Sequence, residues 1–200
     1  MRQRIRVGRL QRLQTQLEAM TAVERLAWAG NLFGSKAVAT ACLGADCAVM
    51  LHMMAQASPE TRVFVIAPGE LTEETLAAVE EMKRRLGLEV QLLDLTAPAS
   101  QTLKQTAAAL DSGEGLADAL DDAFCWISDV RHDQAGRNSP RVALERLDDG
   151  LYQLNPLYDW SQKKIDAYRE QHHLPKPAHG GWRIAVNSQA AFSALHGARA

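Results

Sequence analysis

The chain is poor in cysteine, in excess charge of either sign and in long apolar runs. Its three cysteines, Cys42, Cys47 and Cys125, are not an even-numbered, closely spaced set, so we expect reduced thiols rather than a disulfide framework. The 22 basic and 24 acidic residues leave a net charge of -2, which argues against nucleic-acid or membrane-surface partners. No stretch approaches the ~20 apolar residues of a membrane span, and none follows the basic start as a signal peptide would. We therefore expect a reduced protein of the cytoplasm.

The alternation of apolar segments predicts an α/β fold. With 200 residues, of which 46% are hydrophobic, the chain is long enough for one domain with a sizeable core. Three strand-like segments alternate with helical ones, which implies a parallel sheet with right-handed crossovers. The expected strands cover 36–44, 61–67 and 88–95, and the helices between them cover 45–56 and 72–87.

The rest of the chain completes this single domain. Apolar spacing predicts two helices before the sheet, and Thr21 to Glu24 has the pattern of a capping box. We expect 96–122 to be helical, with a turn at Ser112-Gly113. The remaining expected elements are a strand at 124–130, a polar loop at 131–139, a strand–turn–strand unit at 142–160 and a helix at 161–173. The domain 1–200 would thus have an N-terminal helical region (1–30), an α/β core (31–182) and a loop-like tail (183–200).

Three loops are candidates for a binding site, because ligands of open parallel sheets bind at the carboxyl ends of the strands. They are 42–46, 67–72 and 129–139. Gly44 precedes a helix whose free N–H groups and dipole suit a phosphate or sulfate, although a glycine there is also commonly structural. The third loop contains Arg131, Gln134 and Arg137, and guanidinium forks match phosphate and sulfate oxygens. The alternative is a solvated loop in which acidic residues pair with these arginines.

Four motifs occur in a recognisable order. Cys42-Leu43-Gly44 stands where a Ser-Phe-Gly phosphate loop would be, and Ile66 to Thr75 is similar to Ile-Asp-Thr-Gly-x-Leu-x-x-Glu-Thr. Arg131 to Ala135 is similar to Arg-Arg-x-Gln-Ser, and Asn155 to Trp160 matches Asn-Pro-Leu-x-Asp-Trp. Over roughly residues 20 to 182 the chain resembles the phosphoadenylyl-sulfate (PAPS) and adenylyl-sulfate reductase family. The resemblance implies a three-layer, Rossmann-like fold of the adenine nucleotide alpha-hydrolase type.

The resemblance also implies a function. An adenylylated sulfate nucleotide would bind along the strand ends and be reduced to sulfite in sulfate assimilation and cysteine biosynthesis, with thioredoxin or glutaredoxin as electron donor. The implied substrate-binding residues are Cys42, Gly44, Gly69, Arg131, Gln134 and Arg137. In the family a cysteine in a Glu-Cys-Gly-x-His tail attacks the sulfate. These 200 residues contain no such tail, and Ala67-Pro68 replaces Asp-Thr. We therefore expect a degenerate member whose turnover is open.

Two classes of function remain. The first is an enzyme that uses another thiol, either Cys42, Cys47 or a cysteine of a partner chain; a thiolate at a helix N-terminus has a lowered pKa, although an unpaired cysteine is usually a small buried residue. The second is a non-catalytic nucleotide-binding or regulatory subunit, as a homodimer or with a partner. Adenylylation with ATP is disfavoured because no Ser-Gly-Gly-x-Asp-Ser loop is present.

Metal cofactors are not expected. No Cys-Cys pair is present for an iron–sulfur cluster. His172, His173 and His179 have no cysteine or acidic partner at the spacing of metal ligands.

Overall fold

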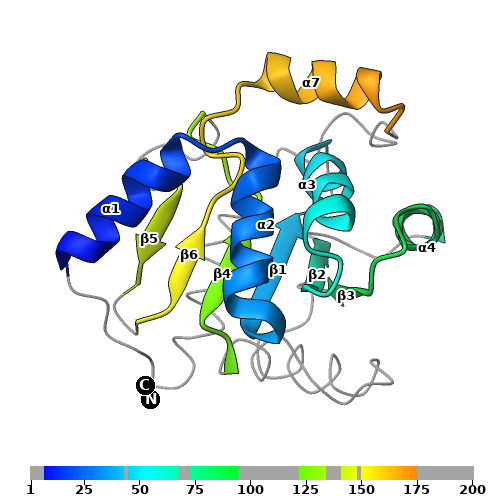
Figure 1. Ribbon diagram of the computed structural model, residues 1–200. Helices are drawn as coiled ribbons and strands as arrows, with labels where there is room; N and C mark the ends of the chain where they lie inside the picture. Colours follow the sequence, from blue (N-terminus) through cyan, green and yellow to red (C-terminus); the bar gives the residue numbers. More distant parts are fainter. Residues whose placement is uncertain are drawn as a thin grey trace.

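The computed structural model describes residues 7–42, 45–67, 73–94, 122–133, 141–147 and 150–174. The described helices are α1 (Val7–Glu18), α2 (Ala22–Phe33), the short 3₁₀ helix η1 (Gly34–Lys36), α3 (Ala45–Ala57), α4 (Glu73–Leu86) and α7 (Gln162–Gln171). The described strands are β1 (Ala37–Cys42), β2 (Arg62–Ala67), β3 (Val90–Asp94), β4 (Cys125–Ser128), β5 (Leu144–Arg146) and β6 (Tyr152–Leu154). Each lies within or close to a segment that the sequence predicts as that type of element (Figure 1).

Within the described residues the strands form one sheet in the order β3-β2-β1-β4-β6-β5. All neighbours are parallel except β5, which pairs antiparallel with β6. The predicted parallel sheet is therefore confirmed, and the strand–turn–strand unit provides its antiparallel edge. The chain first builds outward from β1 through β2 to β3 and then places β4 on the opposite side of β1. This reversal is a topological switch point, where open α/β sheets bind their ligands.

Local signals account for several helix ends. The Thr21 side chain accepts a hydrogen bond from the Glu24 backbone N–H at 3.3 Å, and the Glu24 carboxylate accepts one from the Thr21 N–H at 2.7 Å. This is the predicted capping box, and it begins α2 directly after the turn that follows α1. At the C-terminal end of α4, Gly87 has a positive φ of 63° and its N–H donates a hydrogen bond to the Lys83 carbonyl. Glycine takes this conformation without strain, so the helix ends there as expected.

The core lies between β1 and the helices that cover it. β1 is buried along its length from Ala37 to Ala41, as a central parallel strand should be. On α3, Met50, Met53 and Met54 are buried, and α2 and α3 lie side by side over β1 (Figure 1). The two helices approach closely at Gly30, where an added Cβ would lie 2.7 Å from the Cβ of Ser58.

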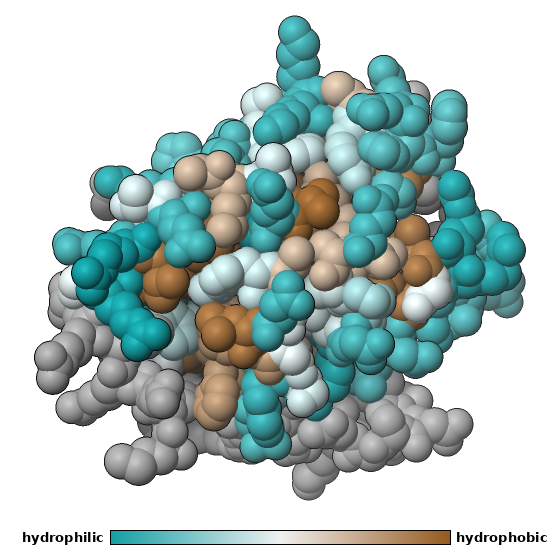
Figure 2. Space-filling view, viewed as in Figure 1, coloured by the Kyte–Doolittle hydropathy of each residue, from teal (hydrophilic) through white to brown (hydrophobic). Residues whose placement is uncertain are grey.

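The surface of this face is polar over α4 and α7, and its apolar residues form small separate patches (Figure 2). Among the described residues, the exposed large hydrophobic side chains are Leu32, Leu76 and Phe124. No described helix has the length and apolar character needed to cross a membrane.

Several predictions fall on residues that the structure does not describe. They are the helical prediction for 96–121, the first residue of the helix predicted at 72–87 and the tail predicted at 183–200.

Candidate functional site at the sheet switch point

The candidate site is built at the carboxyl ends of β1 and β4, together with the first turn of α3. We call this region the switch-point edge. Thr40 of β1 lies opposite Ser128 of β4 in the parallel register. Beyond that level β1 ends at Cys42 and α3 begins at Ala45, while β4 continues into Asp129 to Asp133. The predicted loops 42–46 and 129–139 therefore start from neighbouring strands.

A buried side-chain hydrogen bond joins β1 to β4. The Trp126 indole N–H donates to the Thr40 hydroxyl at 2.7 Å, with both side chains buried. Within the end of β4, the Ser128 hydroxyl accepts a hydrogen bond from the Val130 backbone N–H at 3.3 Å. A buried hydrogen bond of this kind is costly to break, so it fixes the two strands relative to each other just below the edge.

Arg131 is the charged centre of the switch-point edge. Its side chain is 1% exposed. The guanidinium Nε lies 3.2 Å from the carboxylate of Asp46, in the first turn of α3, and a terminal nitrogen lies 2.8 Å from the carboxylate of Asp133. It also donates to the Trp160 carbonyl at 3.0 Å and to the Gln162 side chain at 2.8 Å. One arginine thus joins the end of β4 to α3 and to the start of α7.

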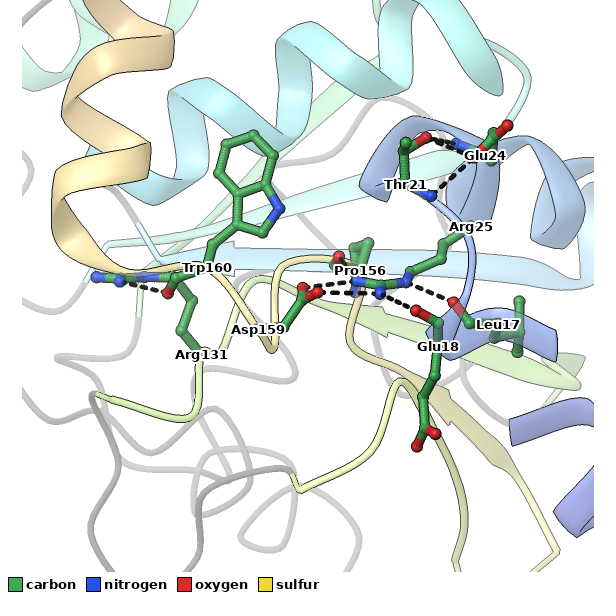
Figure 3. A network of polar contacts seen from close by, with 9 residues as sticks. All are labelled: Leu17, Glu18, Thr21, Glu24, Arg25, Arg131, Pro156, Asp159 and Trp160. Atoms are coloured by element: carbon green, nitrogen blue, oxygen red, sulfur yellow. Dashed lines mark hydrogen bonds and ion pairs between the residues drawn. The ribbon is translucent and has the colours of Figure 1, made fainter. Parts of the chain in front are cut away.

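A second buried arginine, Arg25 of α2, holds the same region from the other side (Figure 3). It is also 1% exposed, and it donates to the Pro156 carbonyl at 2.8 Å and to the Asp159 carboxylate at 2.7 Å. Burial alone would raise the pKa of Asp159, but the hydrogen bond and charge of Arg25 outweigh it and lower this pKa. We call Asn155–Trp160 the clamped segment, because Arg25 binds its middle and Arg131 binds its end.

Cys47 and Cys125, whose side chains the structure describes, are both buried. Cys47 is buried in α3, which fits the alternative of a small packing residue. Cys125 is fully buried in β4, and its burial raises the pKa of the thiol far above the usual range, against a smaller opposing effect of the Leu154 backbone. Because the thiolate is the nucleophilic form, Cys125 is unsuited to attack a substrate at neutral pH. Cys42 ends β1 at the switch-point edge, and its side chain is outside the described set.

Gly44, Gly69, Gln134 and Arg137 lie outside the described residues, so their assignment as binding residues stays a prediction. The same holds for Arg131 as a direct ligand, since the contacts described for it are to protein groups. The sequence analysis did not predict Asp46 as a partner of Arg131. The signal available in the sequence was an acidic residue in the first turn of the helix that follows Gly44.

A histidine–tyrosine cluster that sequence reasoning also missed joins α3 to α7. His52 Nδ1 lies 2.9 Å from the Tyr168 hydroxyl, and the His52 and His172 rings are 4.7 Å apart. The pKa of His52 is lowered, first by burial and then by the charges of His172 and Arg85. Among the described residues, no group of three or more His, Cys, Asp or Glu could hold a metal ion.

A hollow of about 520 Å³ opens beside the second half of α7. Its described lining is Asp166, Arg169, Glu170, His173 and Leu174. Asp166 links the hollow to the contacts of Arg131, because its carboxylate accepts a hydrogen bond at 3.1 Å from Gln162, which in turn accepts one from Arg131.

The comparison with protein families identifies the fold. Residues 36–178 match the family model described as the phosphoadenosine phosphosulfate reductase domain. The chain belongs to this family. The matched region begins just before β1 and includes the switch-point edge, the clamped segment and α7, whereas Arg25 of α2 lies before it.

Individual family members are similar over most of this chain. Phosphoadenosine 5'-phosphosulfate reductase of Vibrio atlanticus is 28% identical over 182 residues, which cover 83% of this chain and 70% of that protein. The protein of the same name from Alkalilimnicola ehrlichii is 28% identical over 186 residues, covering 84% and 74%.

Solved structures support the same fold. The PAPS reductase of Candida auris, solved as a phosphate complex, superposes with a TM-score of 0.64 at 16% identity and covers 93% of this chain and 100% of that one. The NH3-dependent NAD synthetase of Campylobacter jejuni has a TM-score of 0.50 at 13% identity, covering 82% and 73%. The resemblance inferred from the four motifs and the expected adenine nucleotide alpha-hydrolase-like fold are therefore confirmed.

Proposed function

We propose that this protein binds an adenylylated sulfate nucleotide at the switch-point edge and acts in sulfate assimilation. The observation that carries the proposal is the reversal of strand order between β1 and β4, in a member of the reductase family. A reversal of this kind directs the carboxyl ends of two adjacent strands, and the loops that follow them, toward a common ligand.

The proposed contacts follow from the chemistry of the ligand. The first turn of α3 presents backbone N–H groups and the positive end of the helix dipole, which favour a phosphate or sulfate group. We assign Cys42, Gly44, Gly69 and Gln134 to the lining of this site, as the family resemblance implies, and Arg137 to neutralising the ligand's charge.

The proposed reaction is a two-electron reduction by thiols. A thiolate attacks the sulfur of the nucleotide's sulfo group, the S–O bond to the phosphate breaks, and the nucleotide leaves with the electron pair as its phosphate. The resulting S-sulfonate is attacked by a dithiol protein of the thioredoxin or glutaredoxin type, which becomes a disulfide as sulfite is released. Since Cys125 is unsuited and Cys47 is buried, we assign the first thiolate to Cys42 or to a cysteine of a partner chain.

A second candidate function is favoured by the burial of the two thiols. In this case the protein binds the nucleotide without reducing it and acts as a regulatory or partner subunit. A cytoplasmic location belongs to both proposals, because both need access to the nucleotide pool. Assembly as a homodimer is part of both and is measured by sedimentation.

Calorimetric titration of the purified, reduced protein tests the binding proposal. The ligands are phosphoadenylyl sulfate, adenylyl sulfate, adenosine bisphosphate and ATP, each titrated separately. A dissociation constant of about 1 μM for one sulfonucleotide, with weaker binding of ATP, is expected. A folded protein that binds none of the four would refute the proposal.

Sulfite release distinguishes the two candidate functions. Thioredoxin and the preferred nucleotide are added to the wild type and to a Cys42→Ser variant. Release that depends on Cys42 supports the enzyme with this thiolate. Binding without release, both alone and with a candidate partner chain, supports the non-catalytic subunit.

A further inference from the structure

We propose that Arg131 is a positioning residue, which fixes the first turn of α3 against the clamped segment so that this turn can receive an anionic group of the ligand. The proposal rests on the proposed function for the identity of the ligand. It departs from the simpler view that Arg131 contacts the nucleotide itself.

The first support is the number of separate elements that meet at one guanidinium. Its Nε lies 3.2 Å from Asp46 on α3, and its terminal nitrogens bond the Trp160 carbonyl at 3.0 Å and Gln162 at 2.8 Å. The guanidinium is planar and rigid, so partners bound around it are held in fixed relative directions. At 1% exposure, water does not compete for these contacts.

The second support is the charge balance. Arg131 lies within 3.2 Å of two carboxylates, those of Asp46 and Asp133. Its single positive charge is therefore already matched by protein groups. Asp46 stands in the first turn of α3, where the helix dipole favours an anion. Without Arg131 the charge of the Asp46 carboxylate would not be balanced by this ion pair, and it would repel a ligand phosphate or sulfate at the same helix end.

Arg25 provides a matched control. It is buried to the same extent, and it also binds the clamped segment through a backbone carbonyl and a carboxylate. It also bonds the carbonyls of Leu17 and Glu18 at the end of α1, and its guanidinium lies 4.8 Å from the centre of the Tyr158 ring in the clamped segment. None of these contacts is to α3.

The experiment compares Asp46→Asn, Arg131→Lys and Arg25→Lys with the wild type. Asp46→Asn is the mild change, because the Asp46 side chain is 17% exposed and asparagine is well accepted near a helix start. Hydrogen exchange is measured without ligand at the amides of Val49 to His52, which bond the carbonyls of the first turn of α3 and so report its fraying, and sulfonucleotide affinity is measured by calorimetry. Each variant is first shown to be folded under the conditions of the measurements.

If Arg131 positions α3, the variants should differ from the wild type in a specific pattern of exchange and affinity. Asp46→Asn and Arg131→Lys should both speed exchange of the amides of Val49 to His52 and weaken nucleotide binding by about tenfold. The double variant should be little worse than either single one, because the two residues act through one contact. Arg25→Lys should lower overall stability but leave exchange of these amides unchanged.

A direct contact between Arg131 and the ligand predicts the opposite change in the nucleotide affinity of the Asp46→Asn variant. Removing the Asp46 carboxylate would then release Arg131 toward the nucleotide, so Asp46→Asn would bind more tightly, and that result overturns the proposal. Unchanged exchange in α3 in both variants overturns it as well. A wild type that binds no nucleotide refutes the proposed function instead, and the exchange measurement then decides by itself whether Arg131 positions α3.

Discussion

Replacing Arg25 by methionine is expected to destabilise the fold strongly. Methionine keeps most of the aliphatic stem and removes the guanidinium, so the loss reports on polar contacts rather than on a cavity. Those contacts join the end of α1, the first turn of α2 and the clamped segment.

The size of the loss follows from the exposure of each partner. Asp159 is 42% exposed, so water can replace Arg25 at that carboxylate and the ion pair contributes little. The bond to the Glu18 carbonyl is long, at 3.3 Å. The bonds to the Leu17 and Pro156 carbonyls are both 2.8 Å and buried. At about 1.5 kcal/mol or more for each hydrogen bond from a charged donor, we expect a loss of about 3 kcal/mol in the free energy of unfolding.

Urea unfolding followed by circular dichroism measures this loss. The control is Arg84→Met, because Arg84 forms only a surface ion pair with Glu81 and is largely exposed. Its expected effect is below about 0.5 kcal/mol. Equal losses in the two variants would show that the buried contacts of Arg25 contribute no more than a surface pair, and the reasoning would be wrong.

Three further predictions follow. Gly30→Ala should cost about 1–3 kcal/mol of stability, since its Cβ would lie 2.7 Å from that of Ser58; a thermal midpoint equal to wild type would contradict this. The lowered pKa of His52 means that the unfolded state binds its proton more readily, so stability should fall as the pH drops from about 7.5 to about 5.5. Urea unfolding at both pH values checks this, and a decrease that persists in full in His52→Gln would rule out His52 as the cause. Cys125 should stay unmodified by a water-soluble thiol reagent in the native protein and react after unfolding; peptide mass spectrometry detects the label, and rapid native labelling would refute the assigned burial.

The parts of the fold that the sequence predicted well depend on local signals. The capping box at Thr21 needs only a hydroxyl and a carboxylate three residues apart, and Gly87 ends α4 through its own backbone conformation. The alternation of apolar strands with helices determines a parallel sheet, because a right-handed crossover is the usual way to connect such strands. These features can be inferred from one sequence because each spans few residues.

The parts that were missed depend on contacts between distant residues. Arg25 and Asp159 are 134 positions apart, and His52 and Tyr168 are 116 apart. Nothing in the local pattern of Arg131 distinguishes a guanidinium that faces a ligand from one that binds Asp46 and Trp160, because the difference is one of burial. The family resemblance points to this loop as part of the binding site, but the role of the Arg131 side chain in it depends on packing.

The two arginine contacts of the clamped segment also bear on the order in which the protein can assemble. Arg25 and Arg131 both precede the segment in the chain, so during synthesis each is made before Pro156, Asp159 and Trp160. Until those residues leave the ribosome, Arg25 has only its carbonyl partners at the end of α1 and Arg131 only its carboxylate partners among these contacts, so burying either cation would be costly. The nascent sheet should therefore stay loosely packed around both arginines, and docking of the segment should coincide with final consolidation of the core.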